Sequence, residues 1–226
     1  MEGLPEQCAC GEDYNMNHAM ICKLGGYVCS RHDEVRDLTV KMLKEVCVEV
    51  TSEPLLLRIE GEQLQYATAN RSAEARVDFS ARGFWTRGQR AYGDIRIFDP
   101  MAASHIQLSL DAAHKRNQDE KLRAYGERIQ NIDRGSFTPL VFTTSGGMGP
   151  MAKMFYSRLA EIMAERKQQA KSFVTAWMRC RLSFSLLRSA IHCLRGTRSS
   201  IQRPIHVENN DFEAIIAESR IDMRLT

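Results

Sequence analysis

The pattern of apolar and polar residues along the chain predicts a mixed α/β fold. Apolar residues at helical spacing within 36–50 predict a helix that leads into a β-branched strand. Residues 76–84 and 91–98 alternate between apolar and polar side chains, which predicts two strands joined as a hairpin. A long charged helix over 111–132 and an apolar strand over 137–144 follow. The predicted order is helix, strand, strand, strand, helix, strand.

The last third of the chain has a different pattern. Residues 151–169 and 172–195 each combine an apolar stripe with a face that carries Lys and Arg, which predicts two amphipathic helices. The ending over 201–226 is acidic, and its pattern fits one short helix or a frayed tail. The sequence contains no internal repeat and no low-complexity tract.

Length and composition are those of a soluble globular protein. The chain has 226 residues, of which 43% are hydrophobic and 26% charged, so we expect one core domain with appendages, or a domain beside a small module. No window reaches the roughly 18 consecutive apolar residues of a membrane helix. The first twenty residues carry Glu2, Glu6, Glu12 and Asp13 where a signal peptide would be basic and then apolar. We therefore expect an intracellular protein, nuclear or cytoplasmic, without a membrane partner.

The net charge of +3 is unevenly distributed. Residues 151–200 hold 10 Lys and Arg against 2 Asp and Glu, whereas residues 1–150 hold 18 against 21. Such a basic block is typical of a surface that binds a polyanion such as nucleic acid. A solvated helical face is the alternative interpretation.

The cysteines indicate a metal site near the N-terminus. Seven cysteines exclude a fully paired disulfide framework, and four of them lie in the first thirty residues. Cys8, Cys10, His18 and Cys22 form a C-x-C-x7-H-x3-C pattern, in which the last two lie one helical turn apart. Together they supply the four ligands of a structural, tetrahedral zinc site. Reduced thiols without a metal are the alternative, and two neighbouring residues are alternatives to Cys10: Cys29 and His32.

Two aspartates occupy the polar side of the predicted hairpin. If the strands pair, Asp78 and Asp94 converge at one end of a sheet and can hold Mg²⁺, which binds a few carboxylates together with water and phosphate oxygens. Lys121 and Tyr125 lie four residues apart on the next helix, so an ammonium and a phenol can both face the hairpin. Exposed aspartates on a solvated strand face are the alternative.

The order of these motifs resembles the restriction-like endonuclease (RLE) domain of non-LTR retrotransposons. In that family a C-C-H-C zinc knuckle precedes the motifs R-H-N, E-P and K/R-P-D, a second acidic residue and a K-x-x-x-Y helix. The corresponding residues here, after the cysteine cluster, are Arg31-His32-Asp33, Glu53-Pro54, Arg76-Val77-Asp78, Asp94 and Lys121-x-x-x-Tyr125. The chain is also similar to the PD-(D/E)XK nuclease superfamily. The motifs cover about residues 8–125.

The resemblance implies a fold and a domain organisation. We expect an α/β, restriction-endonuclease-like αβββαβ core with an N-terminal zinc knuckle and C-terminal helices. The expected parts are the knuckle over 1–30, the nuclease core over 31–150, a basic helical extension over 151–200 and an acidic tail over 201–226.

The resemblance also implies an activity. It is that of a Mg²⁺-dependent DNA endonuclease that nicks target DNA, so that a reverse transcriptase can prime on the freed 3′-hydroxyl. Asp78 and Asp94 would bind Mg²⁺, Lys121 would orient water or stabilise the transition state, and Arg96 and Tyr125 would support phosphate. The expected partners are DNA, the RNA of the element and a reverse transcriptase domain, which this chain does not contain.

Three residues depart from the family pattern. Val77 replaces the proline of K/R-P-D, Asp33 replaces the asparagine of R-H-N, and Arg96 stands where the wider superfamily has a catalytic lysine. Arginine stays protonated and binds phosphate as a planar fork, so a base role would fall to water or Lys121. A catalytically inactive, zinc-containing remnant that binds nucleic acid is therefore the alternative function.

Overall fold

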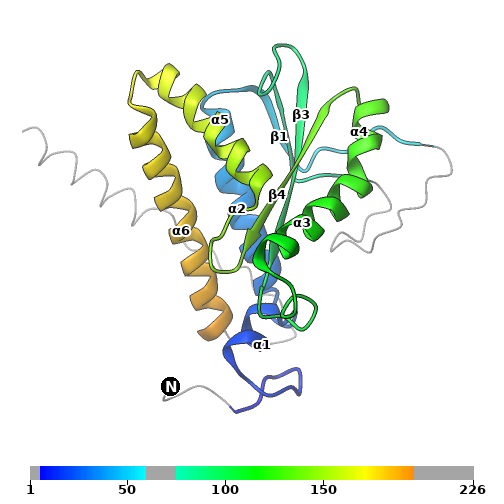
Figure 1. The fold of residues 1–226 in the computed structure, drawn as a ribbon, viewed down its shortest axis with the longest axis vertical. Coiled ribbons are helices and arrows are strands. Elements are labelled where there is room, and N and C mark those ends of the chain that lie inside the picture. The colour runs from blue at the N-terminus through cyan, green and yellow to red at the C-terminus, as the bar shows by residue number, and fades with distance from the viewer. Residues whose placement is uncertain (1–5, 60–74, 196–226) are drawn as a thin grey trace, which may run out of the picture.

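The computed structural model describes residues 6–59 and 75–195, which form a mixed α/β fold around a four-stranded sheet (Figure 1). Its strands lie across the sheet in sequence order: β1 (Val48–Ser52), β2 (Phe79–Arg82), β3 (Arg90–Phe98) and β4 (Ser136–Thr143). The first three strands pair antiparallel, and β4 pairs parallel to β3. A parallel pair needs a crossover connection, and a long helical segment provides it here.

Helices cover both faces of the sheet (Figure 1). The main hydrophobic core lies on the face covered by α2 and α5, against which α6 packs in turn, and in it Phe79, Phe142 and Phe155 are almost completely buried. The crossover helices cover the other face, where Tyr92 and Ile129 belong to a second, smaller cluster. In sequence order the helices are α1 (Met16–Ile21), α2 (Tyr27–Lys44), α3 (Leu110–Lys121), η1 (Leu122–Gly126, a π-helix), α4 (Glu127–Asn131), α5 (Pro150–Lys167) and α6 (Lys171–Arg195).

The predicted hairpin is confirmed, and its register is well defined. Phe79 pairs with Gly93, and Arg82 pairs with Arg90. A Cβ atom at Gly93 would lie 2.1 Å from Cζ of Phe79, so the phenylalanine ring fills the space that a side chain would need. Close packing of this kind favours one register, because a slip of one residue would turn the apolar side chains to the other face.

The other predicted elements are confirmed with different boundaries. The helix predicted within 36–50 is α2, which begins nine residues earlier at Tyr27, and the β-branched residues after it form β1. The strand predicted over 76–84 covers only Phe79–Arg82, because Val77 donates its N–H to Pro54 O, outside the hairpin. The helix predicted over 111–132 is α3, η1 and α4 in succession.

Some expectations concern residues outside the described part of the chain. The acidic tail over 201–226 and the last residues of the basic extension, 196–200, lie outside it. Among the helices in the described ranges, none has the length and apolar character needed to cross a bilayer.

His114 on α3 gives the fold a predictable response to acid. Its ring is buried and packs edge-on against Phe98. Burial lowers the pKa of His114, and the charge of Lys153 lowers it further. The unfolded chain therefore takes up a proton near the ordinary histidine pKa of about 6.5, whereas the folded chain does so only at lower pH. This residue thus makes the folded state lose stability as the pH falls below that value.

We expect His114→Gln to reduce the acid sensitivity of folding. The fall in Tm between pH 7 and pH 5 should be smaller in this variant than in the native chain, as thermal unfolding followed by circular dichroism would measure. His192→Gln is the matched control, because it removes another histidine and leaves His114 in place. An equal fall in Tm in the native chain and in His114→Gln would contradict the prediction.

Candidate functional site

The four residues predicted as zinc ligands lie together. The ligand atoms of Cys8, Cys10, His18 and Cys22 are all within 4.8 Å of one another, the only such group of three or more Cys, His, Asp or Glu within residues 6–59 and 75–195. The sulfur atoms of Cys8 and Cys22 are 3.8 Å apart. A tetrahedral zinc ion with Zn–S bonds of about 2.3 Å needs sulfur atoms at about this separation. The donor set and its spacing therefore fit zinc.

Local backbone structure brings the two halves of this cluster together. Cys8 donates its N–H to Glu12 O, and Gly11, at φ 94°, completes the turn between them. The side chain of Asn15 caps α1 by accepting the N–H of His18. His18 Nε2 then lies 3.3 Å from the sulfur of Cys10. The bend and the helical turn predicted from the spacing are both present.

The electrostatics of the cluster favour a metal-binding thiolate. Burial raises the pKa of Cys8, but the backbone N–H of Cys10 and hydrogen bonds from neighbouring side chains lower it to about 7. Burial raises the pKa of Cys22 instead, and Cys8 contributes to that rise. A bound cation would relieve the conflict between these two thiols, since the thiolate is the form that binds a metal. Cys29 is exposed on α2 and is not part of the cluster.

Asp78 and Asp94 lie at the same level of neighbouring strands. Phe79 pairs with Gly93, so the antiparallel register places Asp78, one residue before β2, opposite Asp94 in β3. Residues that face each other in this way have side chains on the same side of the sheet. Both side chains are largely buried, with 13% of Asp78 and 8% of Asp94 exposed.

Lys121 connects the crossover helix to this pair. Its Nζ lies 2.7 Å from Oδ2 of Asp94, and the same ammonium lies 5.7 Å from the centre of the Tyr125 ring. Burial raises the pKa of Asp94, and although Lys121 opposes this, the charge of Asp78 adds to it, leaving a value of about 6. Burial lowers the pKa of Lys121, but the two carboxylates reverse this and raise it. The structure therefore brings together Asp94, Lys121 and Tyr125, with the charge of Asp78 acting on them.

His32 joins the site through a contact that the sequence analysis did not assign. Its Nε2 lies 3.1 Å from Oδ2 of Asp78, and its Nδ1 lies 3.3 Å from Oδ1 of Asp33. Burial alone would lower the pKa of His32, but the two carboxylates raise it to about 10. Asp78 also accepts the backbone N–H of Ile95. In the sequence, a role for His32 at this site was indicated only by its position in the Arg31-His32-Asp33 motif.

Asp33, the residue after His32 in this motif, extends the network towards β1 through Arg36. Arg36 forms ion pairs with Asp33 at 2.9 Å and with Glu53 at 3.0 Å. Glu53 belongs to the Glu53-Pro54 pair that follows β1. Two motifs far apart in the sequence thus meet beside Asp78 in the fold.

Arg96 is held at the end of the site by α3. Its Nε donates to Oδ1 of Asn117 at 3.2 Å, and Asn117 Nδ2 in turn lies 3.2 Å from Nε2 of His105. Arg96 is exposed, and no ion pair with Asp78 or Asp94 is found for it in the described residues. It is therefore a neighbour of the acidic pair on β3, held by α3.

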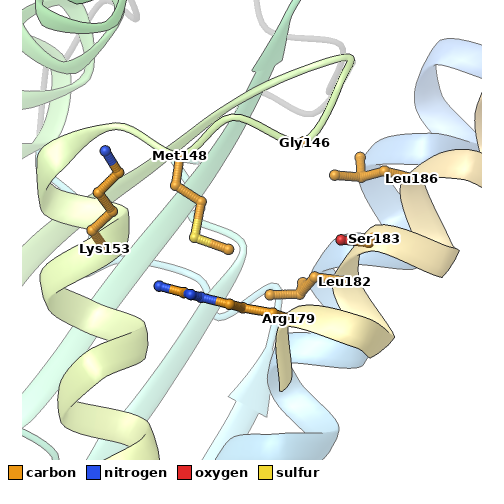
Figure 2. Close-up of a pocket in the computed structure, with 7 residues that line it drawn as sticks. All are labelled: Gly146, Met148, Lys153, Arg179, Leu182, Ser183 and Leu186. Carbon is orange, nitrogen blue, oxygen red and sulfur yellow. The ribbon is translucent and has the colours of Figure 1, made fainter. Parts of the chain in front are cut away.

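The basic block forms an exposed surface on α5 and α6. Four of its cations are in ion pairs with carboxylates of this chain: Arg158, Lys167, Lys171 and Arg188. Lys153 and Arg179 are exposed and have no such pair among the described residues. The two flank a pocket of about 250 Å³ between α5, α6 and the glycine-rich loop after β4 (Figure 2). This pocket therefore brings two unpaired cations of the basic block together.

The chain was also compared with known proteins. No protein-family model matches it, and no curated protein matches its sequence. Its function is therefore inferred from the geometry of the acidic pair, the cysteine cluster and the basic surface.

Proposed function

We propose that this chain is a Mg²⁺-dependent DNA endonuclease domain that nicks target DNA for reverse transcription, with a restriction-endonuclease-like core. The main support is the position of Asp78 and Asp94 at one level of neighbouring strands, with Lys121 in an ion pair with one of them. The order of the sequence motifs is a second, independent support. A zinc-bound knuckle ahead of this core completes the proposal.

The acidic pair fits a hard divalent cation. Two carboxylates at the same level repel each other, which is part of the reason that the pKa of Asp94 is raised. A bound Mg²⁺ relieves that repulsion, and when bound it stabilises charge on the scissile phosphate and lowers the pKa of a water molecule. The residues that would hold it are Asp78 and Asp94.

The other side chains would act on the substrate by position and charge. In hydrolysis, the oxygen of water forms a bond to phosphorus and the P–O3′ bond breaks, and the leaving oxygen takes a proton to become the 3′-hydroxyl. Lys121, kept as an ammonium by its ion pair, places a positive charge beside the phosphate. Tyr125 offers its phenol from the same helix face. His32 holds Asp78 in place from α2.

The activity is tested with supercoiled plasmid. The full, zinc-loaded chain should convert it to nicked circles with Mg²⁺ and leave it intact with EDTA, as an agarose gel would show. Absence of Mg²⁺-dependent conversion under conditions where the protein binds the plasmid would contradict the endonuclease proposal.

The contacts that the two aspartates already make also fit a second function, in which the chain binds nucleic acid without cutting it. Oδ2 of Asp94 already contacts Lys121, and Oδ2 of Asp78 already accepts hydrogen bonds from Ile95 and His32. Carboxylates satisfied in this way also suit a stable core without catalysis. The alternative is a catalytically inactive module that binds nucleic acid, and the plasmid assay separates the two because such a module binds without nicking.

Both proposals expect the basic surface to bind DNA through its phosphates. Arg179→Glu should weaken binding to a labelled duplex by about tenfold and reduce the slope of log affinity against log salt by about 1 to 2. Fluorescence anisotropy at several salt concentrations measures both quantities. Lys44→Glu makes the same change of charge at the exposed end of α2 and should have a smaller effect. Equal losses in the two variants would mean that only the net charge matters.

A further inference from the structure

Helix α6 carries a second apolar stripe on the side away from the core. The side that packs on α2 and α5 contains Val174, Met178 and Leu182, all about 2% exposed. The opposite side is also apolar, and Figure 1 shows that α6 lies at the edge of the molecule. Its members follow one another at spacings of four and three residues, and Trp177 among them also packs partly against the main core: Phe173, Trp177, Cys180, Phe184, Leu187 and Ile191.

This spacing is that of a coiled coil. A repeat of four and three residues is the a/d pattern of a heptad, and here it continues over about three heptads. Phe173, Phe184, Leu187 and Ile191 are between 48% and 61% exposed, although such residues are usually buried. A helix that is apolar all round is normally covered on every side, so this stripe calls for a neighbour in addition to α2 and α5.

The residues that flank the stripe differ on its two sides. One flank carries Arg181 and Arg188, and the other carries the small residues Ala176, Ser183 and Ala190. Arg188 forms an ion pair with Glu34 at 3.2 Å, and Arg181 lies over the ring of Trp177. Both arginines already have partners within the chain. The arginine flank therefore does not need acidic residues of a binding partner to balance its charge.

We propose that this face of α6 binds α6 of a second copy of the chain as a parallel two-stranded coiled coil. In a parallel pair, the arginine flank of each copy faces the small-residue flank of the other, so like charges do not meet. In an antiparallel pair, the two arginine flanks would face each other. Two-fold pairing of one surface with itself is also the commonest arrangement of soluble oligomers.

The available surface suits a dimer of moderate affinity. The four exposed apolar side chains present roughly 400 Å² per chain, since each is about half exposed and large apolar side chains bury about 150–200 Å². A standard interface buries about 800 Å² per partner, and Trp177, Cys180 and the flanks supply part of the difference. We therefore expect a dissociation constant in about the micromolar range.

The oligomeric state is measured by sedimentation equilibrium on the full, zinc-loaded chain. We expect a reversible monomer–dimer equilibrium, and Leu187→Glu should raise the dissociation constant by about thirtyfold or more, because it places a charge in the seam. Met154→Glu is the matched control, since Met154 is a similarly exposed apolar residue on α5. A monomer at all concentrations, or a dimer unaffected by Leu187→Glu, would overturn the proposal.

Cys180 reports the direction of the pair. In a parallel, in-register coiled coil, the two copies of Cys180 face each other, so mild oxidation should give a disulfide-linked dimer. The link should be lost in Cys180→Ser and kept in Cys29→Ser, which removes a different exposed thiol. Leu187→Cys in the Cys180→Ser background should restore it, because an antiparallel pair cannot align both positions. Failure to restore the link would overturn the parallel arrangement.

Two other occupants of the stripe would give different results. If residues 196–226 of the same chain cover it, the native chain stays monomeric, and a chain that ends at Arg195 dimerises instead. If another protein covers it, both forms stay monomeric. Either result would overturn the proposed pairing of two copies, whereas Mg²⁺-dependent nicking is measured separately and does not depend on it.

Discussion

An Asp94→Asn variant is expected to lose Mg²⁺-dependent nicking by about a thousandfold, since a metal ligand supplies several kcal/mol of transition-state stabilisation and each 1.4 kcal/mol is about tenfold in rate. The substitution keeps the shape of the side chain but removes its charge, and it also removes the partner of Lys121. Asp78→Asn should have a similar effect on the rate. Nicking under single-turnover conditions is the measurement, because it separates chemistry from product release.

Folding must be checked alongside the rate in these variants. The side chains of Asp94 and Lys121 are only 8% and 17% exposed, so breaking their ion pair leaves a largely buried ammonium and lowers the free energy of unfolding. The comparison is therefore made at a temperature at which each variant is folded, as shown by circular dichroism. Asp111→Asn, in the exposed first turn of α3, is the matched control and should nick at the native rate. Nicking at equal rates by the native chain, Asp78→Asn and Asp94→Asn would remove the proposed mechanism.

The second large effect is expected in the cluster of Cys8, Cys10, His18 and Cys22. We expect the native chain to be purified with one zinc ion and Cys22→Ser to be purified with none, because a structural zinc site depends on all four ligands. Elemental analysis measures the metal. Loss of zinc should also lower the Tm of the remaining fold, since α1 packs against the end of α6.

Cys29→Ser distinguishes the two possible ligand sets. Cys29 is exposed on α2 and lies outside the cluster, so this variant should keep its zinc and its Tm. Zinc retained by Cys22→Ser, or lost by Cys29→Ser, would mean that the ligands lie elsewhere.

The order of the elements could be predicted from the sequence, because their periodicity is local. The start of α2 could not, since its first turns bury polar side chains. Arg31 is only 2% exposed and donates to the backbone carbonyl of Met20. Charged and polar residues at buried positions interrupt the apolar stripe by which a helix is recognised.

The candidate site could be predicted only in part for a related reason. The aspartates, the lysine and the tyrosine were accessible through strand alternation and helical spacing, which are local patterns. The contact between His32 and Asp78 joins residues 46 positions apart and depends on how α2 packs on the sheet. The position of Arg96 depends in the same way on Asn117, which α3 brings to β3. Contacts of this kind follow from tertiary packing, which spacing alone does not determine.

The π-helix η1 explains how Lys121 and Tyr125 remain in one row. An α-helix advances by about 100° per residue, so a step of four residues overshoots a full turn by about 40°. The wider turn of η1 cancels most of this overshoot between these two residues, and the row then continues to Ile129 in α4. The length of η1 therefore sets the angle about the helix axis between the end of α3, which carries Lys121, and α4, which carries Ile129. Deleting a single residue from it would rotate one end against the other by about a quarter of a turn, leaving the composition of both ends unchanged.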